Sequence, residues 1–101
     1  MSVPAFEFHP EAVLETWAAR RWYAERSPRA AAAFWDELKR AKQQVAENPD
    51  RWATYLHGTR RYVFGKFPYA LVYAAMGDRV VALAVAHTSR RPGYWRNRLS
   101  G

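Results

Sequence analysis

Two proline-headed helical segments joined by a very short link constrain the fold of this chain more than any other feature. Ser27-Pro28 ends one segment and starts the next, because serine can cap a helix and proline fits the first helical position. The second segment, residues 28–47, ends at Asn48-Pro49. Its apolar residues recur at helical spacing: Phe34, Leu38, Ala41 and Val45. Because the link is so short, the two segments are predicted to form an antiparallel helical hairpin.

The first segment, residues 9–27, predicts a helix that starts at Pro10, with Glu11 near its positive end. Its core-facing stripe is expected to contain residues at helical spacing: Leu14, Trp17, Ala18, Arg21 and Trp22. The aromatic residues of both segments are expected to lie in the core and not to bind a cofactor: Trp17, Trp22, Phe34 and Trp35.

Strand-like runs flank the helical hairpin on both sides. Residues 3–8 predict a short opening strand, and residues 60–67, 67–76 and 79–87 predict three more. Gly77-Asp78 is expected to form the tight turn before the last of them. In that last run alternation places three larger residues on one face and three alanines on the other: Val81, Leu83 and Val85 against Ala82, Ala84 and Ala86.

The order of these segments is βααβββ, which predicts an α+β protein with a single domain over residues 1–101. We expect a mostly antiparallel four-stranded sheet with the helical hairpin packed on one face. The other face of the sheet is expected to be left partly open.

Positive charge is concentrated in the second half of the chain. Residues 1–50 carry a net charge of −1, whereas residues 51–101 carry nine Lys/Arg against one acid, a net of +8. This asymmetry favours a polyanionic partner, either nucleic acid or an acidic protein segment. The alternative is that the arginines only solvate exposed strands.

Several classes of protein are disfavoured by the composition. The chain has no cysteine, so it has no disulfide, thiolate nucleophile or thiolate zinc site. Clustered metal ligands and Gly-rich phosphate loops are not evident either, so no metal and no cofactor are expected. No apolar run is long enough to cross a bilayer, and the first residues do not have the pattern of a signal peptide. A cytoplasmic protein without a membrane partner is therefore expected.

Three blocks of sequence carry a resemblance to a known family: ENPDRW (47–52), RRYVFGKFPYALVY (60–73) and VAHTSRRPGYW (85–95). Together they resemble the RelE/ParE toxins of bacterial type II toxin–antitoxin systems, which include plasmid stabilisation proteins. The resemblance covers nearly the whole chain and includes the βααβββ order. It implies a small toxin held inactive by a cognate antitoxin with an acidic, partly disordered segment.

The resemblance implies two different targets for such a toxin. The RelE branch cleaves messenger RNA in the ribosomal A site without a metal, and this ribosome-dependent endoribonuclease is the main hypothesis. The ParE branch inhibits DNA gyrase and is not known as a nuclease. A third alternative is an inactive member that acts only as a basic binding module. The loop before the predicted second strand has few cations, which favours the gyrase hypothesis.

Metal-free RNA cleavage needs a base, an acid and cations around the phosphate. Carried onto this sequence, the family pattern implies catalytic roles for His87, Tyr94 and Arg61. The same pattern implies substrate-binding roles for four cations: Arg60, Lys66, Arg90 and Arg91. Because neighbouring strand residues point to opposite faces, Arg60 and Arg61 are not expected to face the substrate together.

A structural role is the alternative for several of these residues. By alternation His87 shares a face with Val81, Leu83 and Val85, so it could cap the core through a hydrogen bond. Tyr94 and Trp95 could fold back over the sheet as a hydrophobic lid, and for Trp95 this interpretation is preferred. His9 and His57 are expected to have no chemical role.

Overall fold

The structure, a computed structural model, describes residues 4–100 of the chain. Its elements follow in this order: β1 (Ala5–Phe8), α1 (Pro10–Ala24), α2 (Pro28–Glu47), β2 (Ala53–Thr54), the 3₁₀ turn η1 (Leu56–Gly58), β3 (Arg60–Val63), β4 (Tyr69–Met76), β5 (Arg79–His87) and the 3₁₀ turn η2 (Arg96–Ser100). The strands form one sheet in the order β1-β5-β4-β3-β2. The pair β1–β5 is parallel and the other pairs are antiparallel.

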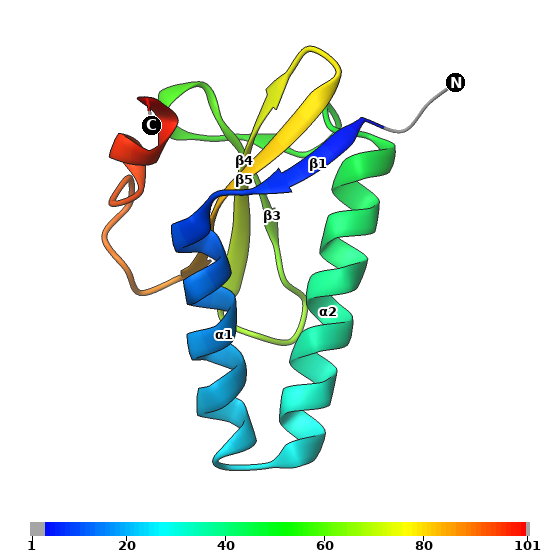
Figure 1. Cartoon of the computed structure of the whole chain (residues 1–101), viewed down its shortest axis with the longest axis vertical. Coiled ribbons are helices and arrows are strands. Elements are labelled where there is room, and N and C mark those ends of the chain that lie inside the picture. Colours follow the sequence, from blue (N-terminus) through cyan, green and yellow to red (C-terminus); the bar gives the residue numbers. More distant parts are fainter. Residues whose placement is uncertain (1–3, 101) are drawn as a thin grey trace.

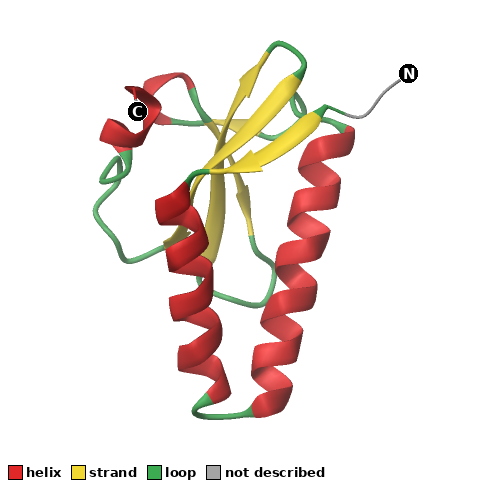
Figure 2. Ribbon diagram, viewed as in Figure 1, coloured by secondary structure: helices red, strands yellow, loops and turns green. Residues whose placement is uncertain are grey.

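The predicted α+β class and the helical hairpin on one face of the sheet are confirmed (Figure 1). Figure 2 shows the two helices side by side in front of the strands, with the tip of the hairpin extending past them. The prediction of four strands missed β2, which is only two residues long and pairs with the start of β3. Val3, the first residue of the predicted opening strand, lies outside the described residues.

Side-chain caps fix where both helices begin. The Ser27 hydroxyl accepts a hydrogen bond from the Ala30 backbone N–H at 3.2 Å, as the sequence predicted. At the start of α1, His9 has this role, since its Nδ1 accepts the Glu11 N–H at 3.1 Å. His9 therefore has a local structural function, and Pro10 follows it at the first helical position.

The predicted apolar stripe of α2 is confirmed. Phe34, Leu38, Ala41 and Val45 are all buried and pack against the sheet residues Leu71, Tyr73, Val80, Ala82 and Val85. Phe34 is the centre of an aromatic cluster that includes Tyr23, Phe64, Phe67 and Tyr69. This cluster is the main core between the hairpin and the sheet.

The predicted core-facing stripe of α1 is wrong. Leu14, Trp17 and Trp22 are 61%, 50% and 49% exposed, and Ala18 and Arg21 are exposed as well. The buried face of α1 consists of small residues: Ala12, Thr16 and Ala19. Small side chains let the helix backbone lie close to β5, which leaves the large apolar residues on its outer surface. Of the four aromatics expected in the core, Phe34 is buried and Trp35 is half-buried.

A bulge in β5 changes which residues face the helices. Val72 pairs with Ala84 but Tyr73 pairs with Ala82, so Leu83 is an extra residue in β5. Before the bulge Ala82 faces the helices, and after it Val85 does so, while Leu83 and Ala84 both face the opposite side. The predicted alternation is therefore wrong beyond Leu83. His87 shares a face with Val85 but not with Val81 or Leu83.

The sheet face opposite the helices is covered over β4 and β5 by residues 88–100, here called the C-terminal segment. Trp95 is 1% exposed and packs against Val72, Ala74, Leu83 and Ala84. The preferred interpretation of Trp95 as a lid is confirmed. The expectation of a partly open face is wrong for this region, since the segment forms a second core there.

Candidate functional site

Five of the seven predicted site residues line one small cavity, here called the cationic cleft. The cleft lies between the ends of β3, β4 and β5 and the C-terminal segment, and its volume is about 100 Å³. The five residues are Arg61, His87, Arg90, Arg91 and Tyr94. Three guanidinium groups in one cleft fit a phosphate or carboxylate ligand, which Arg binds through paired hydrogen bonds.

Aromatic rings position two of the three guanidinium groups. The Arg61 guanidinium carbon lies 4.3 Å from the ring centre of Tyr55, and that of Arg90 lies 3.8 Å from the ring centre of Tyr94. Tyr55 and Tyr94 pack in turn against the core around Trp95. Cation–π contacts of this kind contribute roughly 0.5–1 kcal/mol each at exposed sites. They orient the cations while leaving their N–H groups available to a ligand.

The remaining two predicted residues lie elsewhere. Arg60 points to the helix side of the sheet, opposite Tyr73, and donates to the Trp52 carbonyl at 2.7 Å. Arg61 is opposite Val72 on the other face, so the predicted split of this pair is confirmed. Lys66 is exposed in the β3–β4 loop, and that loop is held on the α2 side by a 2.7 Å bond from the Gly65 N–H to Glu37.

His87 lies at the end of β5 with one ring nitrogen engaged. Its Nδ1 accepts the Ser89 backbone N–H at 3.0 Å and lies 2.7 Å from the Ser89 hydroxyl. The imidazole also packs edge-on against Tyr69, with ring centres 5.1 Å apart. A neutral ring in this arrangement carries its proton on Nε2. Among residues 4–100 no carboxylate orients the imidazole, so Ser89 alone fixes its tautomer.

The Tyr94 hydroxyl forms a hydrogen bond with a carboxylate that the sequence reasoning missed. The hydroxyl donates to Glu15 of α1 at 2.6 Å. Burial, followed by this hydrogen bond and the Glu15 charge, raises the pKa of Tyr94 well above its ordinary value. At neutral pH the hydroxyl is therefore protonated and points at Glu15.

Glu15 connects three parts of the protein. Besides Tyr94 it accepts the Val85 N–H at 3.0 Å and two bonds from the Arg98 guanidinium at 2.9 and 3.0 Å. Arg98 also donates to the Leu83 carbonyl at 2.9 Å. The Glu15 and Arg98 side chains are only 15% and 12% exposed. The sequence did offer one signal for this contact, the small residues along one face of α1. Small side chains let the helix lie close to the sheet, so a carboxylate beside them can reach it.

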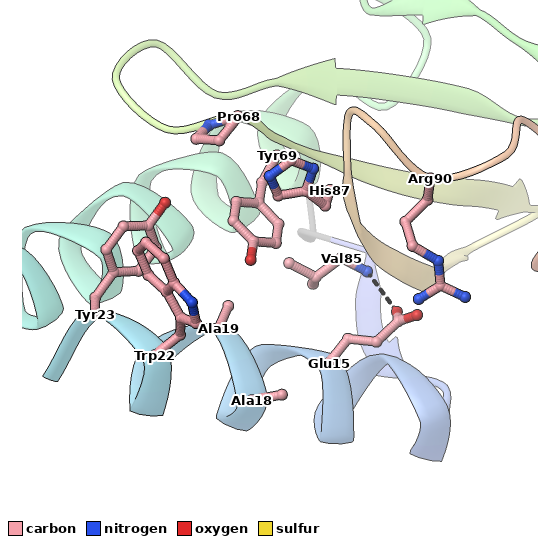
Figure 3. Close-up of a pocket in the computed structure, with 10 residues that line it drawn as sticks. All are labelled: Glu15, Ala18, Ala19, Trp22, Tyr23, Pro68, Tyr69, Val85, His87 and Arg90. Atoms are coloured by element: carbon pink, nitrogen blue, oxygen red, sulfur yellow. Dashed lines mark hydrogen bonds between the residues drawn. The ribbon is translucent and has the colours of Figure 1, made fainter. Parts of the chain in front are cut away.

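A larger groove of about 470 Å³ adjoins the cationic cleft and is here called the α1–β5 groove. Figure 3 shows it between α1 and the edge of β5, with Trp22 and Tyr23 at one end and Glu15 and Arg90 at the other. His87 and Arg90 line both cavities. The turn that carries these two residues therefore separates the cleft from the groove.

Two further observations concern the part of the chain that the structure describes. Within residues 4–100, no three His, Asp or Glu side chains are grouped so that they could hold a metal ion. None of the helices there is both long enough and apolar enough to cross a membrane.

The fold and the cleft define a class of protein: a small basic α+β protein whose sheet end and C-terminal segment group several arginines around one cleft. The family model described as ParE toxin of type II toxin-antitoxin system, parDE, matches residues 6–92. The chain belongs to this family, which confirms the resemblance to RelE/ParE toxins stated from the sequence.

The solved structures agree with this assignment at the level of the fold. A chain from the chromosomal ParDE TA system from P. aeruginosa superposes with a TM-score of 0.74 at 12% identity. The match covers 84% of this chain and 96% of that chain. No curated protein matches the sequence.

Proposed function

We propose that this protein is the toxin of a ParE-type pair and that it acts by binding DNA gyrase and not by cutting RNA. The observation that carries this proposal is the hydrogen bond from Tyr94 to Glu15. RNA cleavage without a metal needs an acid and a base on opposite sides of the phosphate. With Tyr94 protonated and directed at Glu15, His87 is the one cleft side chain of the type that most often serves as a general acid or base.

The cations of the cleft suit binding without chemistry. Arg61, Arg90 and Arg91 are exposed, and none of them forms a salt bridge within residues 4–100. Such groups can pair with carboxylates on a protein target or with phosphates of its bound DNA. The net charge of +7 would draw the toxin to either surface.

A cognate antitoxin is the second proposed partner. Its acidic, partly disordered segment would become ordered on the toxin. The outer face of α1 offers apolar surface for such a segment, since Val13, Leu14 and Trp17 are 37%, 61% and 50% exposed. Both this partner and the target would be met in the cytoplasm. A toxin of this kind would arrest growth, and on a plasmid the pair would stabilise plasmid inheritance.

A ribosome-dependent endoribonuclease is the second candidate function. One observation favours it: the fold brings His87, Arg61, Arg90 and Arg91 to one cleft, as the family pattern for nucleases implies. In this case messenger RNA on the ribosome would be the substrate, with His87 as the acid or base.

Induced expression with and without the antitoxin, followed by two assays on the purified toxin, separates these functions. We expect growth arrest, loss of gyrase supercoiling activity and intact message in a reconstituted translation reaction. His87→Ala and Tyr94→Phe should retain toxicity, and the double change Arg90→Glu, Arg91→Glu should abolish it. Lys66→Glu is the matched control, because Lys66 is an exposed cation outside the cleft.

New 5′ ends in register with codons, seen only with ribosomes present and lost in His87→Ala, would replace the gyrase proposal with the ribonuclease. Absence of growth arrest by the folded protein would leave the inactive basic binding module as the remaining function.

A further inference from the structure

The tip of the helical hairpin carries a concentration of positive charge that the proposed function does not use. Residues 20–29, here called the arginine tip, contain four arginines against one glutamate, a net charge of +3: Arg20, Arg21, Arg26 and Arg29. The first half of the chain has a net charge of −1 as a whole, so this excess is local. All four arginines are exposed, and none of them forms a salt bridge within residues 4–100.

Tryptophan rings hold two of these guanidinium groups in place. The Arg26 guanidinium carbon lies 3.6 Å from the ring centre of Trp22, and one of its N–H groups donates to the Trp22 carbonyl at 2.8 Å. The guanidinium carbon of Arg20 lies 5.8 Å and 5.7 Å from the ring centres of Trp17 and Trp35. A guanidinium that already rests on a ring loses less freedom when it binds an anion, and its other N–H groups stay available to that anion.

Helix stability does not account for the position of Arg29. This residue lies in the first turn of α2, where the helix dipole is positive and a cation is unfavourable. No acidic residue of that turn offsets it. Arg21, in contrast, lies in the last turn of α1, where a cation is favourable. An anion bound at the arginine tip would compensate the charge that Arg29 adds there.

The surroundings of the rings favour duplex DNA among the possible polyanions. Proteins that bind single strands leave aromatic ring faces free for stacking on bases. Here Arg26 covers one face of Trp22, and Trp17 packs against Trp35 with ring centres 5.8 Å apart. The rings therefore serve to orient cations, and oriented cations are what contact with the phosphates of a duplex requires.

The width of the hairpin limits how it can meet a duplex. Packed helices lie about 8–10 Å apart and each is about 10–12 Å across, so the pair spans roughly 20 Å. The major groove is only about 12 Å wide. Because the tip projects past the strands, it can reach the phosphate backbones without entering the groove (Figure 2). Contacts of this kind do not depend on base sequence.

From these observations we propose that the arginine tip binds the phosphate backbone of duplex DNA without sequence preference. This surface is separate from the cationic cleft, since Trp22 lies at the opposite end of the α1–β5 groove from Arg90 (Figure 3). The inference goes beyond the proposed function, because it does not depend on which target the toxin inactivates.

Fluorescence anisotropy with a labelled, mixed-sequence duplex of about 20 base pairs tests this proposal between about 50 and 200 mM salt. We expect Arg26→Glu combined with Arg29→Glu to weaken binding about tenfold or more. The slope of log K against log salt should become shallower by about 2, since each phosphate contact contributes about 0.9. The matched control is Lys42→Glu combined with Lys66→Glu, which changes the net charge equally at exposed positions outside the tip. Equal losses in the two double variants would overturn the proposal, because overall charge would then account for binding.

Two further measurements locate the contact. Trp22→Leu keeps every charge but removes the ring under Arg26, so it should weaken binding about threefold with the salt slope unchanged. In amide NMR of the unmodified protein, the duplex should shift the signals of residues 20–30. Shifts confined to the cationic cleft would overturn the proposal.

Competition at one salt concentration distinguishes duplex DNA from other anionic partners. The competitors are a single strand of the same length, polyglutamate and phosphatidylserine vesicles. Preference for any of them over the duplex would overturn the assignment in favour of single-stranded nucleic acid, an acidic protein or a membrane surface. The gyrase assays are read separately, so the two proposals fail independently.

Discussion

Replacing Glu15 by alanine should destabilise the protein more than any other single surface-accessible carboxylate change. The substitution leaves the Arg98 guanidinium, the Tyr94 hydroxyl and the Val85 N–H without their acceptor. Removing one partner of a buried ion pair costs about 3–5 kcal/mol, and each unsatisfied neutral donor costs roughly 1–3 kcal/mol more. Because both charged side chains retain slight exposure, water relieves part of this cost, and we expect a loss of about 3 kcal/mol.

Urea denaturation measures this loss directly. For an m-value of about 1–3 kcal/mol/M, the midpoint should fall by roughly 1–3 M with m unchanged. Glu11→Ala is the control on the same helix, where the favourable interaction with the helix dipole, about 0.3–1 kcal/mol, is lost together with a minor charge interaction with Arg98. A Glu15→Ala midpoint equal to that of Glu11→Ala would refute the reasoning that Glu15 connects α1, β5 and the C-terminal segment.

A double-mutant cycle tests whether the charge of Arg98 is the main source of the cost. Adding Arg98→Met to Glu15→Ala removes the orphaned guanidinium and leaves an apolar stem in its place. We expect the double variant to be at least as stable as Glu15→Ala alone. If the two losses simply add, Glu15 and Arg98 are not coupled and their contact contributes little.

Three further changes probe other parts of the structure. Trp95→Ala should cost about 3–5 kcal/mol in chemical denaturation, whereas Trp17→Ala should cost less than about 1 kcal/mol, because only Trp95 is buried; equal losses would contradict the observed packing. Burial raises the pKa of Tyr73 to about 12 in the folded protein, so as the pH rises the tyrosine loses its proton first in the unfolded chain. The free energy of unfolding should therefore fall between pH 10 and 12. Denaturation measured across this pH range should show a smaller fall for Tyr73→Phe. Ser27→Ala should lower stability by about 1 kcal/mol through loss of the α2 cap, and Ser27→Asp should restore it.

The parts of the fold that could be predicted are those determined by local patterns. Helix α2 has an amphipathic stripe, a serine cap and a terminating Asn-Pro, and its predicted range agrees with the observed one. The last strand was predicted with its observed limits for the same reason, since a turn at Gly77 precedes it and an apolar run fills it.

The parts that failed depend on contacts between distant residues. The packing face of α1 consists of Ala12, Thr16 and Ala19, whereas the helical spacing of the large apolar residues of this helix predicted a different face. The bulge at Leu83 leaves no mark in an uninterrupted apolar run, yet it changes the facing of every later residue in β5. His87 was therefore predicted to share a face of the sheet with Val81, Leu83 and Val85, but of these only Val85 lies on its face.

The candidate site also has a part that could be predicted and a part that could not. Strand order and the family resemblance predicted that five residues would lie together: Arg61, His87, Arg90, Arg91 and Tyr94. What Tyr94 contacts did not follow, because its partner Glu15 is 79 residues away in the chain. Whether these residues act on RNA stays a prediction that the experiments above address.

The burial of Trp95 has a consequence for synthesis of the toxin. One wall of the cationic cleft is made by the C-terminal segment, which is synthesised after the strands that it covers. Strand β1 likewise cannot pair until β5 has been synthesised. A nascent chain, or a fragment that stops before residue 95, therefore lacks both the second core and the finished cleft. The cationic cleft is therefore complete only in a chain that extends through the C-terminal segment.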